Sequence, residues 1–349
     1  MKLNILIEIN HPAHFHLFKN PIDQLINWPN TKVIILAKRD QPLTALLETK
    51  KNWHIVYEGY RGKSVFKKII KQIRYTFLAM NLISKENIDI CAGVSVTMPH
   101  AAFIKGRKSF VFDDDDKKTT PIFAFLAHSL ATKVFSPDCL NKGNPNKKDH
   151  YYQGFHELAY LHPQNFTPVK SVLDNLKIKE KQQYFIVRFN AFKAHHDRGE
   201  HGLNFEQRKT LLEHLRKYGE VIVSEEGKGF SLNNQFLNIH PIYFHSLLNF
   251  ASLYIGESQT MASEAAMLGI PAIRINSFKG RISYLDELEV KYDLLRSFTP
   301  DEFDEAIKYC NKLLKKKNTA AWQQKRQNML NDKIDVSKYI VNQFVNKSN

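Results

Sequence analysis

The stretch Gly256-Glu257-Ser258-Gln259-Thr260-Met261-Ala262-Ser263-Glu264-Ala265-Ala266-Met267-Leu268-Gly269-Ile270-Pro271-Ala272 decides the fold of this 349-residue chain. Apolar runs at 253–255 and 272–275 flank it, which predicts a strand, a tight polar turn, a short helix and a second strand. The turn places free backbone N–H groups at a helix start, where the helix dipole adds partial positive charge. We therefore predict a phosphate or diphosphate site between Gly256 and Thr260.

Glu264 lies about one helical turn beyond this predicted anion site. A carboxylate placed there can accept hydrogen bonds from sugar hydroxyls. A nucleotide sugar carries both a diphosphate and ribose hydroxyls, and this class of ligand therefore fits the stretch.

Outward from this stretch, short apolar runs alternate with amphipathic segments. The first half has expected strands at 4–9, 31–37, 54–57, 88–92, 109–112 and 133–136. Its expected helices lie at 17–27, 42–50, 65–84 and 121–131, with a loop and a helix at 94–104. The second half has expected strands at 184–188, 220–224, 237–239, 253–255 and 272–275, and expected helices at 205–218, 242–250, 300–314, 319–331 and 336–345. This alternation is typical of parallel sheets with helices on both faces.

The alternation weakens between residues 137 and 169, which contain a turn-rich loop at 141–148. We predict an α/β fold with two Rossmann-like, doubly wound domains that face a central cleft. The N-terminal domain is expected to span 1–165 and the C-terminal domain 166–330, with a terminal helix in 331–349 that crosses back to the first domain. The ligand is expected in the cleft, at the carboxyl ends of the strands.

The net charge of +15 predicts an anionic partner: nucleic acid, a phosphorylated substrate or an acidic membrane surface. A compositional bias toward lysine explains the charge equally well. No nucleic-acid-binding motif is present, and we expect no nucleic acid partner.

Three widely spaced cysteines show no metal or redox pattern and indicate a reducing cytoplasm. The chain shows no signal-peptide pattern and no apolar run near the ~18 residues that span a bilayer.

Three histidines follow the first expected strand, in Asn10-His11-Pro12-Ala13-His14-Phe15-His16. His14 or His16 is the candidate general base, because unperturbed histidine titrates near pH ~6.5. A helix N-cap or a packed core position is the alternative for any one of the three. A zinc site formed by all three is disfavoured, since their spacing does not place them on one helix face. We expect no bound metal.

Four consecutive carboxylates, Asp113 to Asp116, follow the expected strand at 109–112. Their mutual repulsion must be offset by a cation or by lysines. They can bind Mg²⁺, position a substrate hydroxyl or serve as a base, and a solvated acidic turn is the alternative. Their position at a strand end favours a functional role for Asp113 or Asp114.

A cationic loop at 188–199 follows the first strand of the second half, and contains Arg188, Lys193, His195 and His196. Such a loop can neutralise a leaving diphosphate, and a solvated basic loop is the alternative. Glu225 ends the next strand and is expected beside the nucleotide base.

The segment 61–75 has an apolar face and is otherwise rich in lysine and arginine. A basic amphipathic helix of this kind can lie on an anionic membrane. The alternative is a helix packed on the core with a solvated basic face.

Several segments resemble a prokaryotic family known only as a domain of unknown function. They are 7–19, 93–95, 112–115, 187–189 with 194–197, and the opening stretch, so that the resemblance covers roughly residues 1 to 275. That family looks like a GT-B glycosyltransferase. The opening stretch is also similar to a segment of UDP-N-acetylglucosamine 2-epimerases and of the peptidoglycan N-acetylglucosaminyltransferase.

The resemblance to these enzymes implies that Ser258, Gln259 and Thr260 hold the phosphates and that Glu264 holds the ribose. Gln259 stands where those enzymes have glycine. On the acceptor side we expect Asn10, His11 and Ser95. The segment 10–14 differs from the Gly-Thr-Arg-Pro-Glu type turn of the epimerases, which shifts the interpretation toward a transferase.

We therefore expect a metal-independent glycosyltransferase without a cofactor, whose nucleotide-sugar donor is a substrate. Its expected acceptor is a cell-surface polysaccharide, glycolipid or lipid-linked glycan, and its expected place is the cytoplasm, with the inner face of the membrane as a further partner. The alternatives are a UDP-sugar 2-epimerase or hydrolase, and a non-catalytic protein of the same fold that binds glycans or membranes.

Overall fold

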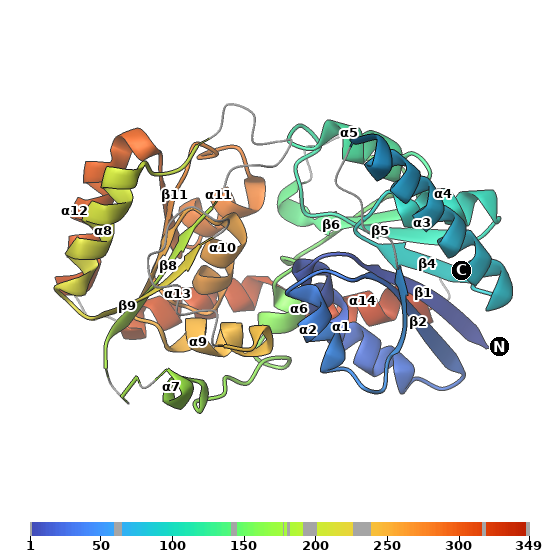
Figure 1. The fold of residues 1–349 in the computed structure, drawn as a ribbon, viewed down its shortest axis with the longest axis horizontal. Coiled ribbons are helices and arrows are strands. Elements are labelled where there is room, and N and C mark those ends of the chain that lie inside the picture. The colour runs from blue at the N-terminus through green and yellow to red at the C-terminus, as the bar shows by residue number, and fades with distance from the viewer. Residues whose placement is uncertain are drawn as a thin grey trace. The chain divides into compact units, whose positions relative to one another are not determined.

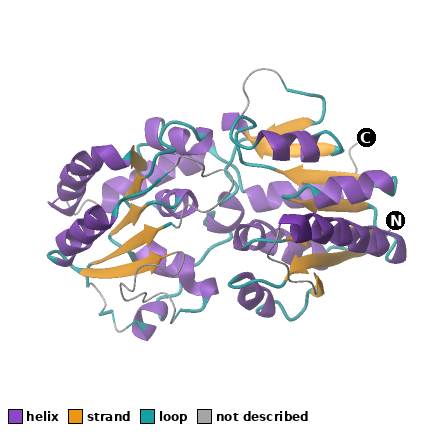
Figure 2. Ribbon diagram, turned by 45° about the horizontal axis from the view of Figure 1, so that its top comes forward, coloured by secondary structure: helices purple, strands orange, loops and turns teal. Residues whose placement is uncertain are grey.

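The computed structural model describes residues 2–58, 65–140, 145–176, 178–179, 182–190, 201–225, 239–315 and 319–346. The chain divides into two compact units, Met1–Asn165 with Ile334–Asn349, and Phe166–Lys333. The first unit therefore includes the C-terminal helix α14 (Val336–Val345), as Figure 1 shows by colour. Within each unit, helices pack against a sheet of parallel strands (Figure 2).

The first unit contains a seven-stranded sheet in the order β3-β2-β1-β4-β5-β6-β7, with all neighbouring strands parallel. The strands are β1 (Leu3–Ile9), β2 (Thr31–Lys38), β3 (His54–Glu58), β4 (Ile90–Gly93), β5 (Lys108–Phe112), β6 (Lys133–Pro137) and β7 (Asp149–Tyr152). The sequence analysis missed the polar strand β7, which forms one edge of this sheet.

Helices cover both faces of the first sheet (Figure 1). They are α1 (Pro12–Ile26), α2 (Leu43–Glu48), α3 (Val65–Lys85), α4 (Thr97–Ile104), α5 (Pro121–Phe123), the π-helical turn η1 (Ala124–His128), the 3-10 turn η2 (Asp138–Leu140), α6 (Leu158–Leu161) and α14. On one face, where α1 and α14 pack together, Phe18 lies on Phe112, and Phe344 lies on Phe110. Val111 belongs to a cluster with η1 on the opposite face, because side chains alternate along a strand.

Helix α1 begins at Pro12, five residues before the start predicted from the sequence. Proline suits the first helical position, because its missing N–H has no partner there in any helix. His11 is the N-cap, and its Nδ1 accepts a hydrogen bond of 3.2 Å from the backbone N–H of Ala13. The early start places His14 and His16 within the helix.

The second unit contains a five-stranded parallel sheet in the order β12-β11-β10-β8-β9. The strands are β8 (Tyr184–Phe189), β9 (Glu220–Glu225), β10 (Leu253–Gly256), β11 (Ala272–Ile275) and β12 (Leu295–Phe298). The sequence analysis missed β12. The strand expected at 237–239 falls mainly outside the described residues.

Helices also flank the second sheet on both faces. They are α7 (Val172–Asn175), α8 (Phe205–Arg216), the 3-10 turn η5 (Pro241–Tyr243), α9 (Phe244–Phe250), α10 (Gln259–Met267), α11 (Ser283–Val290), the 3-10 turn η6 (Pro300–Glu302), α12 (Phe303–Lys315) and α13 (Thr319–Asp332). Ile273 and Ile275 of β11 share a core with residues of α8 and α12. In register, Arg188 pairs with Gly256 and with Ser224, and the carboxyl ends of three strands therefore meet at one edge.

Candidate functional site

Glu8 is the centre of a polar network at the carboxyl end of β1. Its side chain is fully buried and accepts hydrogen bonds from the Nδ2 of Asn10 and the Oγ of Ser95. The Oη of Tyr75, on α3, donates to the Oδ1 of Asn10 at 2.8 Å. Two of the predicted acceptor-side residues, Asn10 and Ser95, are thus joined through a carboxylate that the sequence analysis left unassigned.

Burial raises the pKa of Glu8 to about 7, against the opposing effects of Lys38 and of hydrogen bonds from Asn10, Thr97 and Tyr75. A carboxyl group with a pKa near neutrality can exchange protons at working pH. One signal in the sequence marks this residue, because Glu8 is the only charged residue of the strand Leu-Asn-Ile-Leu-Ile-Glu-Ile.

His14 lies in the first turn of α1 and is partly buried. Burial, followed by the charge of His11, lowers the pKa of His14 to about 3, although Asp114 acts to raise it. His14 is therefore neutral near pH 7, and burial makes it a weaker base than an ordinary imidazole. The hydrogen bond of 3.4 Å from the backbone N–H of Asn10 to its Nδ1 orients the ring.

His16 is buried and packs 5.2 Å from the ring of Tyr160, measured between centroids. This is the packed core position that the sequence analysis gave as the alternative for any of the three histidines. The exposed His11 serves as the cap of α1.

Asp113 and Asp114 have different environments although they are adjacent. The side chain of Asp114 is 32% exposed, and its Oδ2 lies 3.3 Å from the Nδ1 of the buried His156. Burial acts to raise the pKa of the Asp114 carboxyl group, but the charge of His156 and its hydrogen bond outweigh burial and lower this pKa. The pKa of His156 is raised in turn, because Asp114 overcomes the effect of burial. Asp114 thus remains ionised, and its negative charge favours the protonated form of His14.

The side chain of Asp113 is only 3% exposed, with its Oδ2 at 2.8 Å from the Nε2 of His128. Its Oδ1 accepts a hydrogen bond of 3.2 Å from the backbone N–H of Asp115. This arrangement fixes the turn after β5. Of the two predicted carboxylates, Asp114 therefore has the more accessible position. Within the described ranges, no group of three histidine, cysteine or acidic side chains converges to hold a metal ion.

In the second unit, the predicted turn and helix of the opening stretch are present. Ser258 is the N-cap of α10, and its Oγ accepts a hydrogen bond of 3.3 Å from the backbone N–H of Met261. Gly256 precedes the turn at a place where a Cβ would lie 2.4 Å from the backbone oxygen of Arg188. Only glycine permits this approach of β10 to β8. Gln259 and Thr260 form the first turn of the helix.

Glu264 lies on α10 and is buried, with its Oε1 at 2.8 Å from the Nε2 of His245 on α9. Sequence reasoning named Glu264 but did not identify His245 as its partner. The pairing fixes the carboxylate in one orientation.

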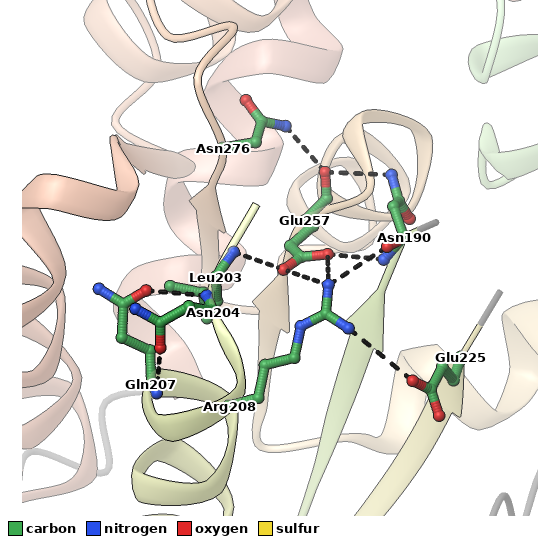
Figure 3. Close-up of polar contacts among 8 residues, drawn as sticks. All are labelled: Asn190, Leu203, Asn204, Gln207, Arg208, Glu225, Glu257 and Asn276. Carbon is green, nitrogen blue, oxygen red and sulfur yellow. Dashed lines mark hydrogen bonds and ion pairs between the residues drawn. The ribbon is translucent and has the colours of Figure 1, made fainter. Parts of the chain in front are cut away.

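Glu257 carries the densest set of polar contacts in this region (Figure 3). Its fully buried carboxylate accepts hydrogen bonds from the backbone N–H groups of Asn190, at 2.6 Å, and Leu203, at 2.7 Å. The Nη2 of Arg208 lies 3.1 and 3.0 Å from its two oxygens. Glu225 stands 3.8 Å from the Nη1 of the same arginine, so that it takes part in this ion-pair cluster.

Asn190 lies near the start of the predicted cationic loop and Leu203 follows its end, and Glu257 therefore binds the chain at both positions. Lys193, His195 and His196 belong to that loop and lie outside the described residues. Arg188 is the first residue of that loop as predicted and lies in β8, and its Nη1 donates to the Oγ of Ser224 on the neighbouring strand.

Two units, each a parallel sheet flanked by helices, give the chain a GT-B-like, two-domain Rossmann fold, the class of its structural neighbours. The chain belongs to the DUF354 family of proteins of unknown function, whose model matches residues 3–347. No curated protein sequence matches it significantly.

Three solved structures illustrate this likeness in fold. A putative UDP-N-acetylglucosamine 2-epimerase from Listeria monocytogenes has a TM-score of 0.67 at 14% identity, over 100% of this chain and 98% of that one. UDP-GlcNAc 2-epimerase from Neisseria meningitidis, bound to UDP-GlcNAc, has a TM-score of 0.65 at 13% identity, over 97% and 98%. MurG from Acinetobacter baumannii has a TM-score of 0.56 at 12% identity, over 98% and 99%.

Across the part of the chain that the structure describes, no helix is both long and apolar enough to span a membrane.

Proposed function

We propose that this protein transfers a sugar from a nucleotide-sugar donor to a hydroxyl group of a glycan or glycolipid acceptor. The observation that carries the proposal is the start of α10, where the Ser258 cap and the oriented carboxylate of Glu264 occur on one short helix. The Neisseria structure of similar fold is described as bound to UDP-GlcNAc, which supports a ligand of this class.

In the proposed mechanism the second unit holds the donor. Backbone N–H groups at the start of α10, from Ser258 to Thr260, bind the diphosphate, and Glu264 accepts hydrogen bonds from the ribose hydroxyls. Arg188, together with Lys193, His195 and His196 of the loop anchored by Glu257, offsets the charge that develops on the leaving diphosphate.

The first unit supplies the base and the acceptor-side residues. The acceptor oxygen attacks the anomeric carbon while its proton passes to the Nδ1 lone pair of the neutral His14, and the long hydrogen bond that this atom accepts from the backbone N–H of Asn10 is given up. The bond between that carbon and the diphosphate oxygen breaks, and its electron pair leaves with the diphosphate. Asp114 stabilises the imidazolium that forms at His14, and the Glu8 network with Asn10 and Ser95 orients the acceptor.

A second candidate function is epimerisation or hydrolysis of a UDP-sugar, which the names of the Listeria and Neisseria structures favour. Such an enzyme would turn over a UDP-sugar without any acceptor, whereas a transferase requires one.

A thermal-shift screen against UDP-, GDP-, CMP- and dTDP-sugars tests the proposal. We expect at least one nucleotide sugar to raise the melting temperature, and the corresponding nucleoside without phosphate to have no effect. If none of the four classes binds, the proposal is wrong. If the bound sugar is epimerised or hydrolysed in the absence of acceptor, the second candidate replaces it.

A further inference from the structure

Exposed apolar side chains gather on one part of the first unit. Of the thirteen large hydrophobic residues that are exposed within the described ranges, seven fall on α3, α4, α5 and η1. They are Ile73, Phe77, Phe103, Ile104, Ile122, Phe125 and Leu126, and we call this set the apolar face. Ile122, Phe125 and Phe103 are 75%, 74% and 65% exposed. An exposed apolar patch of this kind marks an interaction site more often than chance.

The helices that carry the apolar face are packed side by side. α3 lies along α4, and α4 contacts η1, on the same face of the sheet (Figures 1 and 2). The Nε2 of His100 on α4 lies 3.0 Å from the backbone oxygen of Leu126 on η1. Ile73 and Phe77 are four residues apart on α3 and therefore share one side of that helix.

The helices that carry the apolar face contain no negatively charged side chain. The segments 65–85, 97–104 and 121–128, which form its helices, contain no acidic residue. The exposed Lys105, Arg107 and Lys108 follow α4 directly, and they form no ion pair with the described residues. The exposed Lys85 ends α3, and the exposed Lys118 lies shortly before α5.

We propose that the apolar face docks on an anionic lipid bilayer. Aromatic and aliphatic side chains would enter the headgroup boundary, and the lysine and arginine side chains at the rim would meet lipid phosphates. A second copy of the chain fits less well, because a twofold contact would bring two basic rims together.

This docking deepens the proposed function, on which the following step rests. α3 and α4 present apolar residues outward, and on their inner sides they carry Tyr75 and Thr97, which contact the Glu8 network. A docked protein would hold its acceptor-side residues beside the bilayer. The acceptor is then a glycan linked to a lipid.

Sedimentation with vesicles tests the docking on the full-length protein. We expect binding to vesicles of phosphatidylcholine and phosphatidylglycerol in equal parts, and much weaker binding to phosphatidylcholine alone. The double variant Phe103→Ser/Phe125→Ser should bind about tenfold more weakly or worse, because two exposed rings are lost. Val290→Ser is the matched control, since Val290 is 83% exposed on α11 of the other unit and should leave binding unchanged.

The basic rim is tested separately with Lys105→Gln, Arg107→Gln and Lys108→Gln. Each change should weaken binding roughly fivefold, and raising the salt concentration should reproduce the loss. Equal binding to neutral and anionic vesicles, or equal loss in Val290→Ser, would overturn the proposal. So would a wild-type dimer in gel filtration that Phe103→Ser/Phe125→Ser converts to a monomer, because the face would then be a protein interface.

The two proposals fail in different ways. Nucleotide-sugar binding, read by thermal shift, should be the same in Phe103→Ser/Phe125→Ser as in the wild type, which also shows that the variant is folded. Vesicle binding without nucleotide-sugar binding would retain the docking and remove the proposed function. Nucleotide-sugar binding without vesicle binding would do the reverse.

Discussion

Arg208 and Glu257 form a buried ion pair, in which the Nη2 of the arginine lies 3.0 Å from the Oε2 of the glutamate. The same carboxylate accepts hydrogen bonds from the backbone N–H groups of Asn190 and Leu203. The segment between these two residues contains the cationic side chains that are predicted to bind phosphate. The pair therefore links the stability of the second unit to the placement of a loop that is expected to bind the donor.

Glu257→Gln tests this link. The change leaves Arg208 with only the more distant Glu225, at 3.8 Å, to balance its charge, and we expect the free energy of unfolding to fall by about 3 kcal/mol. The amide protons of Asn190 and Leu203 should exchange faster in hydrogen-exchange measurements. Glu305→Gln is the control, because Glu305 forms an exposed i,i+3 pair with Lys308 that should contribute less than about 0.5 kcal/mol. Unchanged exchange at both amides would contradict the anchoring role.

The pKa of Glu8, raised to about 7, predicts a particular pH dependence of stability. The pKa of this carboxyl group is 4.5 in the unfolded chain and about 7 in the native state. Between these two pH values the native state holds a proton that the unfolded chain has released, and the free energy of unfolding therefore falls as the pH rises. Glu8→Gln has no carboxyl group to titrate at this position, and its free energy of unfolding therefore does not fall for this reason. Relative to the wild type, we expect the variant to gain about 3 kcal/mol between pH 4 and pH 8, measured by urea unfolding. Parallel curves for the two proteins would show that the pKa of Glu8 is not raised.

The sheets were predictable where apolar runs end in polar residues. β1 and β10 satisfy this condition, and both were predicted within a residue or two. β7 and β12 do not, because Asp-His-Tyr-Tyr and Leu-Arg-Ser-Phe lack a continuous apolar run and acquire strand geometry only from the neighbouring strand. Helix α1 begins earlier than predicted for a local reason: a proline occupies its first position, and the histidine before it caps the helix.

The candidate site was less predictable because its carboxylates depend on distant partners. Glu8 reaches Ser95 across 87 positions, and Glu257 reaches Arg208 across 49. No local spacing records such contacts. Strand-end position drew attention to Asp113 and Asp114, but only the fold shows that Asp113 pairs with His128 and Asp114 with His156.

Asp114→Ala and Asp113→Ala should separate chemistry from structure. The negative charge of Asp114 favours protonation of His14. Loss of Asp114 should therefore lower kcat by roughly 10²-fold or more in a transfer assay. Asp113 is hydrogen-bonded to His128 and accepts a hydrogen bond from the backbone N–H of Asp115. Loss of Asp113 should therefore lower the free energy of unfolding by about 2 kcal/mol and change kcat only a few-fold. Both rates are compared well below the melting temperature of either variant. Equal losses of kcat would remove the distinction between the two carboxylates.

Glu264→Gln tests the ribose contact without breaking the buried pair. A glutamine has both a donor and an acceptor, and it can therefore still pair with the Nε2 of His245, which lies 2.8 Å from the Oε1 of Glu264. We expect little change in unfolding free energy, but about tenfold weaker binding of the nucleoside diphosphate, because hydrogen bonds from hydroxyls to a charged acceptor are lost. Titration calorimetry with the 2′,3′-dideoxy analogue supplies the matched control. Wild-type protein should bind the analogue about as weakly as the variant binds the parent nucleotide, and the variant should not distinguish the two ligands. If the variant discriminates as strongly as the wild type, then Glu264 only supports His245, and the ribose must be held by another residue.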